Sequence, residues 1–286
     1  MQKIKLFFIN NKLFWIGLIL SFSLLWPFFA APYFSHHDDV QAIRLYEMDK
    51  CIKDLQIPCR WVPDLGGLYG YPLFNFYAPL PYYFGEIFYL LGGSLIFSVK
   101  IMFGFAAIFS YVFMFLLARR FWGDAGALIS GVAYSFAPYH AFDLYVRGAM
   151  GEMWALMIFP AIFWALVRLK EETRVTNVLI LSITVGVLFL SHNLSAMIFI
   201  PILFLAIGFL YFQTKNLRFV RFSVGALILG FVISAFYTIP AYFEKDLVHI
   251  DTTTFGYFSY TEHFKGFRKL FLERSWGWGS SIREVP

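Results

Sequence analysis

Ionisable side chains gather in three short segments of an otherwise apolar chain. Residues 36–39 have the sequence HHDD, residues 147–152 the sequence RGAMGE, and residues 191–193 the sequence SHN. Adjacent carboxylates can take a proton from a hydroxyl nucleophile or bind a divalent cation, and the planar guanidinium of Arg147 matches a phosphate or a carboxylate. These residue types predict a site that binds an anionic substrate and moves a proton.

Each segment also has a purely structural interpretation, which the sequence leaves open. The segment 36–39 suits the N-cap of a following helix, Glu152 suits the positive end of a helix dipole, and residues 191–193 suit a tight turn. Metal binding is open as well. The candidate ligands of a divalent metal ion are Asp38, Asp39 and Glu152, and the sequence offers no decisive ligand set beyond them.

Long apolar runs must position these segments. The chain is 59% hydrophobic and 14% charged, whereas a soluble domain is ~25% charged. A helix needs ~20 residues to cross a ~30 Å hydrocarbon core, where the backbone must satisfy its own hydrogen bonds. We therefore expect an all-α integral membrane protein with about seven transmembrane helices, at residues 13–31, 97–118, 125–142, 150–168, 176–192, 194–212 and 219–243.

The basic residues predict how these helices are oriented. Lys and Arg favour the cytoplasmic side of short loops, and with these spans one side collects Arg119, Arg120, Arg168, Lys170, Arg174, Lys215, Arg218 and Arg221. We therefore expect a multi-pass protein of a bacterial-type plasma membrane, with its N-terminus in the cytoplasm and the three polar segments outside. The net charge of +5 is spread over these loops, which argues against nucleic acid as a partner.

The largest predicted loop, residues 32–96, lies on the outer face. Within it, apolar residues of 40–55 fall near helical spacing and predict an amphipathic helix. Residues 80–96 contain Glu86 and would invert every later span if they crossed, so we expect an interfacial helix there. The alternative is an ordinary span paired with 97–118. Cys51 and Cys59 also lie in this loop, either as a disulfide, which an oxidising exterior permits, or as two free thiols.

The chain divides after the last predicted span. Residues 1–243 form the multi-span membrane module, and residues 244–286 are more polar. The second part is expected to begin another outer loop or domain. Its last residues, 280–286, show no helix cap or stop, so we expect the sequence to be the front part of a longer protein.

Several motifs resemble those of the GT-C superfamily of membrane glycosyltransferases, which transfer sugars from polyprenyl-phosphate donors on the outer face. The resemblance rests on the acidic pair after the first span, on RWVP at 60–63, on GYPLFNFYAPLPYY at 70–83 and on RRFWG at 119–123. More narrowly, the chain is similar to bacterial membrane proteins labelled 6-pyruvoyl-tetrahydropterin synthase-related. The stretches that match these proteins are RGAMGE at 147–152, SHN at 191–193 and SWGWG at 275–279.

The resemblance implies a seven-span front module and a catalytic carboxylate in the first outer loop, hence Asp38 or Asp39. The donor would be a polyprenyl-phosphate sugar, and the acceptor a hydroxyl that the sequence does not identify. Charge that develops on the leaving phosphate would be stabilised by Arg147 and His192, while Glu152 would orient the sugar or a metal. The other expected substrate contacts are His37, Tyr71 and Tyr77.

Two other classes of function compete with a transferase. A lipid or glycolipid transporter or flippase would place charges or broken helices near the middle of the membrane, where the predicted spans carry almost none. A non-catalytic membrane scaffold would have no need to gather Asp38, Arg147, Glu152 and His192 on one side.

Overall fold

The structure is a computed structural model that describes residues 11–33, 35–249, 255–256, 259–264 and 266–267. These residues contain no β-strand, apart from an isolated bridge between Val62 and Tyr71. The helices are α2 (Lys12–Ala30), α3 (Gln41–Lys53), α4 (Leu73–Phe76), α5 (Leu80–Leu90), α6 (Leu95–Ser135), α7 (Pro138–Phe142), the π-helical turn η1 (Asp143–Arg147), α8 (Met150–Glu171), α9 (Val175–Ser191), α10 (Asn193–Thr214), α11 (Leu217–Phe243) and the short 3-10 turns η2 (Lys245–Leu247) and η5 (Tyr260–His263).

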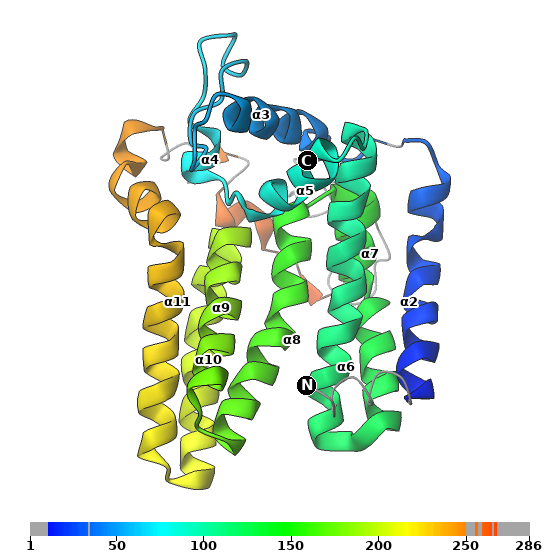
Figure 1. Cartoon of the computed structure of the whole chain (residues 1–286), viewed down its shortest axis with the longest axis vertical. Helices are drawn as coiled ribbons and strands as arrows, with labels where there is room; N and C mark the ends of the chain where they lie inside the picture. The colour runs from blue at the N-terminus through cyan, green and yellow to red at the C-terminus, as the bar shows by residue number, and fades with distance from the viewer. Residues whose placement is uncertain (1–10, 34, 250–254, 257–258, 265, 268–286) are drawn as a thin grey trace.

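Long apolar helices run lengthwise through a single bundle (Figure 1). Five segments are long and apolar enough to cross a membrane: α2, Leu95–Arg147, α8, α10 and α11. The 17-residue α9 is a shorter apolar helix. The all-α membrane fold predicted from the sequence is thereby confirmed, while the count of seven crossings stays a prediction.

Helix α6 folds back on itself at Gly123. This glycine has φ 64° and ψ −167°, a conformation open to glycine and strained for other residues. The two arms lie side by side, since a side chain at Gly131 would collide with the ring of Tyr111. In a continuous helix those two residues would be ~30 Å apart. The turn separates the expected spans 97–118 and 125–142. The second arm of α6 ends at Ser135, and the short helix α7 covers most of the rest of the second expected span.

Small residues let the remaining helices approach closely. A Cβ on Gly230 of α11 would lie 2.9 Å from the carbonyl oxygen of Ser182 in α9, and one on Gly186 would lie 3.1 Å from the carbonyl oxygen of Gly230. Such backbone proximity is typical of helix packing in membranes. Helix α8 is the most buried of the five candidate spans, and so lies at the centre of the bundle.

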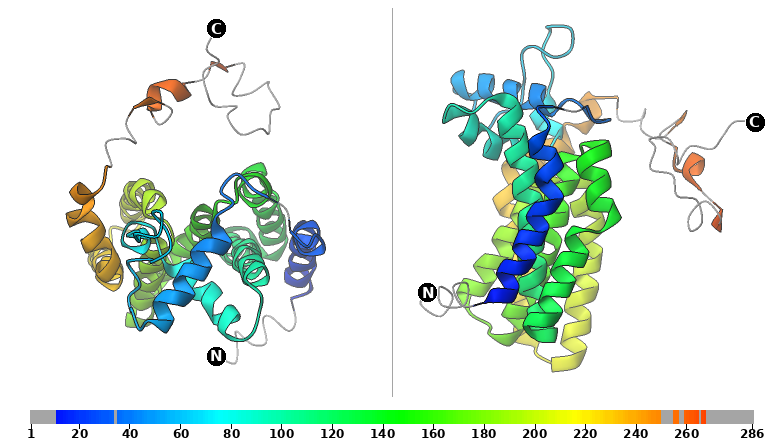
Figure 2. Two further views of the ribbon diagram at one scale, coloured as in Figure 1. Left: turned by 90° about the horizontal axis from the view of Figure 1, so that it is seen from above. Right: turned by 90° about the vertical axis from the view of Figure 1, so that its right-hand side faces the viewer.

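Helices α3, α4 and α5 lie across one end of the bundle, which we call the capped end (Figures 1 and 2). Helix α5 has 11 residues and is therefore ~16 Å long, too short to cross a membrane ~30 Å thick. The length of α5 agrees with the expectation that 80–96 does not cross, and its position at the membrane interface stays a prediction.

The helix expected in 40–55 is confirmed as α3, with two corrections. Its N-cap is Val40 without a side-chain hydrogen bond, so the N-cap role expected for 36–39 is wrong. The expected apolar face is also only partly right: Met48 and Cys51 are buried, whereas Ile43 is half exposed and Leu55 is 83% exposed. Residue 55 lies beyond the end of the helix, where the periodicity no longer applies.

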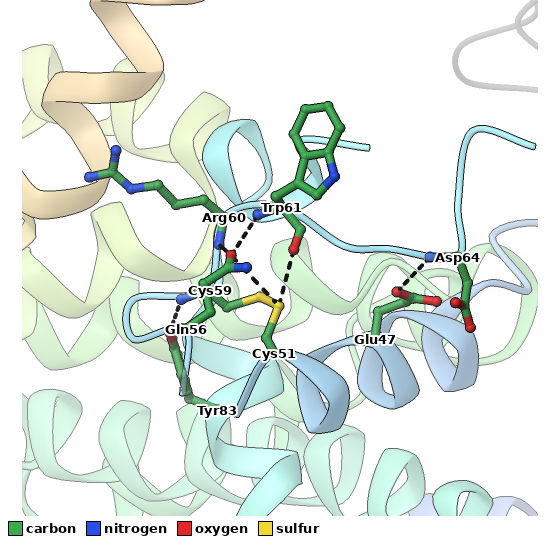
Figure 3. The surroundings of a disulfide bond; sticks show 8 residues. All are labelled: Glu47, Cys51, Gln56, Cys59, Arg60, Trp61, Asp64 and Tyr83. Atoms are coloured by element: carbon green, nitrogen blue, oxygen red, sulfur yellow. Dashed lines mark hydrogen bonds between the residues drawn. A yellow bond between two sulfur atoms is a disulfide. The ribbon is translucent and has the colours of Figure 1, made fainter. Parts of the chain in front are cut away.

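A disulfide bond joins Cys51 of α3 to Cys59 in the following loop (Figure 3). The loop is held further by Gln56, whose side-chain oxygen accepts the backbone N–H groups of Arg60 at 2.7 Å and Trp61 at 2.8 Å. The hydroxyl of Tyr83 in α5 accepts the N–H of Cys59 at 2.8 Å. These bonds fix the loop to both α3 and α5.

The basic turns occupy the opposite end of the bundle (Figure 1). The α6 turn and the α8–α9 turn are linked there by an ion pair of 2.7 Å between Arg120 and Glu171. Grouping of the bases at one end agrees with the loop alternation, and which side of the membrane that end faces stays a prediction. The expected second domain, 244–286, lies largely outside the described residues.

Candidate functional site

The segment that links α2 to α3 is hydrogen-bonded to the start of the 147–152 segment, more than 100 residues away in the sequence. The backbone N–H of His37 donates to the carbonyl of Val146 at 2.9 Å, and that of Asp38 donates to the carbonyl of Arg147 at 2.7 Å. The Gln41 side chain donates to the carbonyl of Gly148 at 2.7 Å. Two of the three polar segments singled out in the sequence are therefore adjacent.

Gly148 allows this close approach. It has φ +67°, and a Cβ there would lie 2.7 Å from the Cβ of His36. The ring of His36 stacks on Phe103, with centroids 6.0 Å apart. Burial lowers the pKa of His36, although the nearby Asp39 charge raises it. His36 is thus a largely uncharged, packed side chain at neutral pH.

Arg147 forms the centre of a compact ionic cluster, which we call the Arg147 cluster: Tyr139, Asp143, Arg147 and Glu152. Its guanidinium contacts Glu152 at 2.6 Å, Tyr139 at 3.2 Å and Asp143 at 3.3 Å. The Tyr139 hydroxyl donates to the same Glu152 oxygen at 2.6 Å. The π-helical turn η1 places Asp143 and Arg147 four residues apart on one face, and Glu152 in the first turn of α8 completes the cluster.

His192, from the third polar segment, lies beside this cluster. Its Nδ1 is 2.7 Å from the Ser195 hydroxyl, and its ring packs on Gly151, where a Cβ would lie only 2.9 Å away. Burial lowers the pKa of His192, while the charge of Glu152 acts to raise it. The three polar segments therefore meet at the capped end.

The two carboxylates of the acidic pair have different surroundings. Asp38 is 2.8 Å from Nδ1 of the neighbouring His37. Asp39 accepts a hydrogen bond from the hydroxyl of Tyr33, which raises the pKa of that phenol to about 12. Asp39 also lines a cleft, described next, and Asp38 does not.

The cleft opens where the end of α2, the start of α3 and the start of α6 meet, and its empty volume, open solvent at the mouth included, is about 380 Å³. Its polar lining residues are Tyr33, His36, Asp39, Gln41 and Lys100. Apolar side chains from all three helices form the remaining wall, namely Phe28, Ala42, Ile96 and Val99. An exposed carboxylate and a basic side chain thus border one open volume with an apolar wall.

The two tyrosines expected to bind substrate differ in position. The ring of Tyr77 lies under the guanidinium of Arg44, 4.0 Å from its centroid, and that guanidinium also contacts the hydroxyl of Tyr82 at 3.4 Å. Tyr82 in turn bonds to Gln41, so Tyr77 is connected to the rim of the cleft. Tyr71 pairs through its backbone with Val62 in the projecting loop, and among the described residues we find no contact between it and the Arg147 cluster.

The described residues contain no group of three or more His, Cys, Asp or Glu side chains that could hold a metal ion. The candidate ligands Asp38, Asp39 and Glu152 are therefore not assembled into such a group. The Glu152 side chain is engaged by Arg147 and Tyr139 instead.

Sequence reasoning missed several residues of this region: Gln41, Arg44, Lys100, Tyr139 and Asp143 as a site residue. A signal for Lys100 was present, because it lies inside the predicted span 97–118. An ionisable residue within a span marks a functional site by default. The tie between Gln41 and Gly148 has no signal in the sequence, since it joins residues that only the fold brings together.

Comparison with known proteins gives a family and no function. No solved structure matches the chain. An uncharacterized protein of Lactococcus lactis subsp. cremoris (strain MG1363) is 22% identical over 244 residues, which are 81% of this chain and 39% of that protein. The chain thus spans about two fifths of the length of this relative.

A family model described as "6-pyruvoyl-tetrahydropterin synthase related domain; membrane protein" matches residues 74–282. The match includes Lys100, Arg147, Glu152 and His192, and begins after the acidic pair 38–39. On this evidence the chain belongs to the 6-pyruvoyl-tetrahydropterin synthase-related family of membrane proteins.

Proposed function

We propose that the protein is a glycosyltransferase that moves a sugar from a polyprenyl-phosphate donor to an acceptor hydroxyl, and that the capped end is its outer, catalytic face. One observation carries the proposal. The backbone bonds from His37 and Asp38 to Val146 and Arg147 hold the acidic pair of the first loop beside the Arg147 cluster and next to an open cleft. The proposed base and the proposed phosphate-binding groups are therefore within one region.

The proposed reaction needs one base and one site for the leaving group. The acceptor oxygen attacks the anomeric carbon of the sugar, the bond from that carbon to the phosphate oxygen breaks, and the polyprenyl phosphate leaves with the bonding electrons. A carboxylate takes the acceptor's proton. We assign this role to Asp39, because it lines the cleft and is exposed, with Asp38 as the alternative.

The remaining residues of the region are proposed to bind or orient the substrates. Glu152, in the Arg147 cluster, and His192, beside it, would orient the sugar, and Arg147 would stabilise phosphate charge. His37 and Tyr77 border the same region. Tyr71, in the projecting loop, would contact the acceptor rather than the donor.

Transfer from a labelled polyprenyl-phosphate sugar by the full chain in liposomes tests the proposal. Asparagine keeps the shape of aspartate and cannot accept the proton, so Asp39→Asn should lower the transfer rate by ~10²–10⁴-fold while donor binding is retained. Asp38→Asn is measured in parallel to assign the base. Asp54→Asn, at the C-cap of α3, is the matched control and should keep full activity.

The competing functions predict other results. A flippase would move labelled lipid between leaflets without a change in its covalent structure, and a scaffold would show neither activity. If Asp38→Asn and Asp39→Asn both retain full turnover, the transferase mechanism is wrong.

A further inference from the structure

Most basic side chains at the capped end already have a partner for their charge. Lys53 forms an ion pair with Asp49 at 2.7 Å, Lys50 forms one with Asp64, and Arg147 contacts two carboxylates. Arg44 stacks on Tyr77. A phosphate that bound to Arg147 would have to compete with Glu152, whose oxygen is only 2.6 Å from the guanidinium.

Lys100 differs from these residues. It is only 8% exposed, its ammonium group donates to the carbonyl of Ala31, and it is 5.9 Å from the ring of Phe28. No carboxylate of the described residues forms an ion pair with it. An ammonium group has three N–H donors, and a buried charge without a counter-charge is unfavourable. An anion that entered the cleft would therefore be bound favourably beside Lys100.

The apolar wall of the cleft indicates what kind of molecule carries that anion. Phe28, Ile96 and Val99 line the cleft next to Lys100. Along the same helices, Trp26 of α2 is 74% exposed and Phe97 of α6 is 48% exposed, as expected of side chains that face lipid. A ligand with a charged head and a hydrocarbon tail could place the head at Lys100 and extend the tail along α2 and α6.

We propose that this cleft binds the phosphate group of a polyprenyl lipid, and that the ammonium group of Lys100 makes the ionic contact. The inference rests on the proposed function, in which that lipid is the sugar donor. It moves the phosphate-binding role from Arg147 to Lys100. Asp39, on the same cleft, then faces the acceptor while Lys100 stabilises the charge that develops on the leaving phosphate.

Binding of a fluorescent polyprenyl phosphate to the full chain in phosphatidylcholine nanodiscs tests the inference without any turnover. Lys100→Gln should weaken binding by roughly 10- to 100-fold, the effect of losing a hydrogen bond to a charged group. Lys100→Arg keeps the charge and should bind nearly as well as the unaltered chain. Lys50→Gln, which removes a lysine that is already paired, is the matched control and should bind normally.

A second variant guards against misfolding of the Lys100 substitutions. Ala42→Leu fills the cleft from α3 without a change in charge, and it should also weaken binding. The corresponding polyprenol, which lacks the phosphate, should bind weakly and equally to the unaltered chain and to Lys100→Gln. Inorganic phosphate and phosphatidylglycerol are the competitors, and neither should displace the probe at equal concentration.

The outcomes are separable. Unchanged binding by Lys100→Gln, or loss of binding in Arg147→Ala alone, overturns the assignment to Lys100. Equal displacement by inorganic phosphate or by phosphatidylglycerol overturns the assignment to a polyprenyl lipid. Because the assay reports binding alone, its failure leaves the Asp39→Asn transfer test standing. Loss of the transferase proposal would likewise leave the lipid-binding result intact.

Discussion

The Arg147 cluster and the Lys100 cleft lie at the same end of the bundle. They differ in whether the positively charged side chain has an acidic partner. In the cluster, one guanidinium is held by two carboxyl side chains and a phenol, with distances of 2.6 to 3.3 Å. In the cleft, one nearly buried ammonium has a carbonyl partner, no carboxylate partner among the described residues, and open space beside it.

This difference in pairing suggests a structural role for Arg147 and a binding role for Lys100. Charges that neutralise one another inside a protein stabilise the arrangement only as a set, because loss of one partner leaves the others buried and unpaired. A buried charge without its own counter-ion lowers stability and favours a charged ligand. We therefore propose that Arg147 serves mainly to hold η1 against α8, and that the cleft is the binding site.

The largest expected effect comes from breaking the cluster. Arg147→Gln leaves the partly buried Glu152 without its counter-charge and removes a hydrogen bond to the fully buried Asp143, and should lower the free energy of unfolding by ~3–5 kcal/mol. Unfolding in mixed micelles measures the change. Arg119→Gln removes an exposed pair with Asp124 and should cost less than ~1 kcal/mol. Similar losses in the two variants would refute a structural role for the cluster.

A second prediction concerns Glu86, a buried carboxyl group outside the Arg147 cluster. Glu86 is 1% exposed, and burial, followed by the nearby charge of Asp49, raises its pKa from 4.5 to about 7. The folded protein then keeps a proton that the unfolded chain releases. Stability from this group therefore falls as the pH rises from about 4.5 to about 7, by roughly 3 kcal/mol in total.

Glu86→Gln removes this titration. The variant should match the unaltered chain near pH 4.5 and should be more stable at pH 8, as measured by thermal unfolding at both pH values. If the difference in stability between the variant and the unaltered chain were the same at both pH values, the raised pKa of Glu86 would be contradicted.

A third prediction concerns the junction between the two regions. Gly148 carries the carbonyl that Gln41 binds and lies against His36, which lines the cleft. Gly148→Ala places a Cβ in the left-handed region, at a cost of ~1–2 kcal/mol, and crowds His36. Gly225→Ala, in open space, is the control and should be neutral or stabilising. We expect only the first variant to lower the melting temperature.

The smallest effect is expected at the cleft itself. Lys100→Met removes a buried charge that has no carboxylate partner and keeps a side chain of similar length. Without lipid ligand its stability should be unchanged or higher by up to ~1 kcal/mol, in the same unfolding assay as Arg147→Gln. A loss as large as that of Arg147→Gln would assign Lys100 to the structural set and weaken the contrast.

Much of the fold could be predicted from the sequence because it depends on local properties. Apolar run length predicted the helices, and Glu86 with the loop alternation predicted that 80–96 does not cross. The contact between Arg147 and Asp143 is also local, since residues four apart share a face of a helix. The N-cap expected at 36–39 failed, because the tertiary structure uses the backbone of that segment to bind residues 146–147.

The candidate site could be predicted only as a set of residue types on one side. The sequence determined that Asp38, Asp39, Arg147, Glu152 and His192 lie near helix ends at one end of the bundle. Only the tertiary structure decided that Arg147 is neutralised, that Asp39 borders a cleft and that Lys100 is buried without a carboxylate. Helix formation and membrane insertion follow from residues close in the chain. Pairing of charges depends on distances of a few ångströms between segments that only folding brings together, because hydrogen bonds and ion pairs weaken steeply beyond contact.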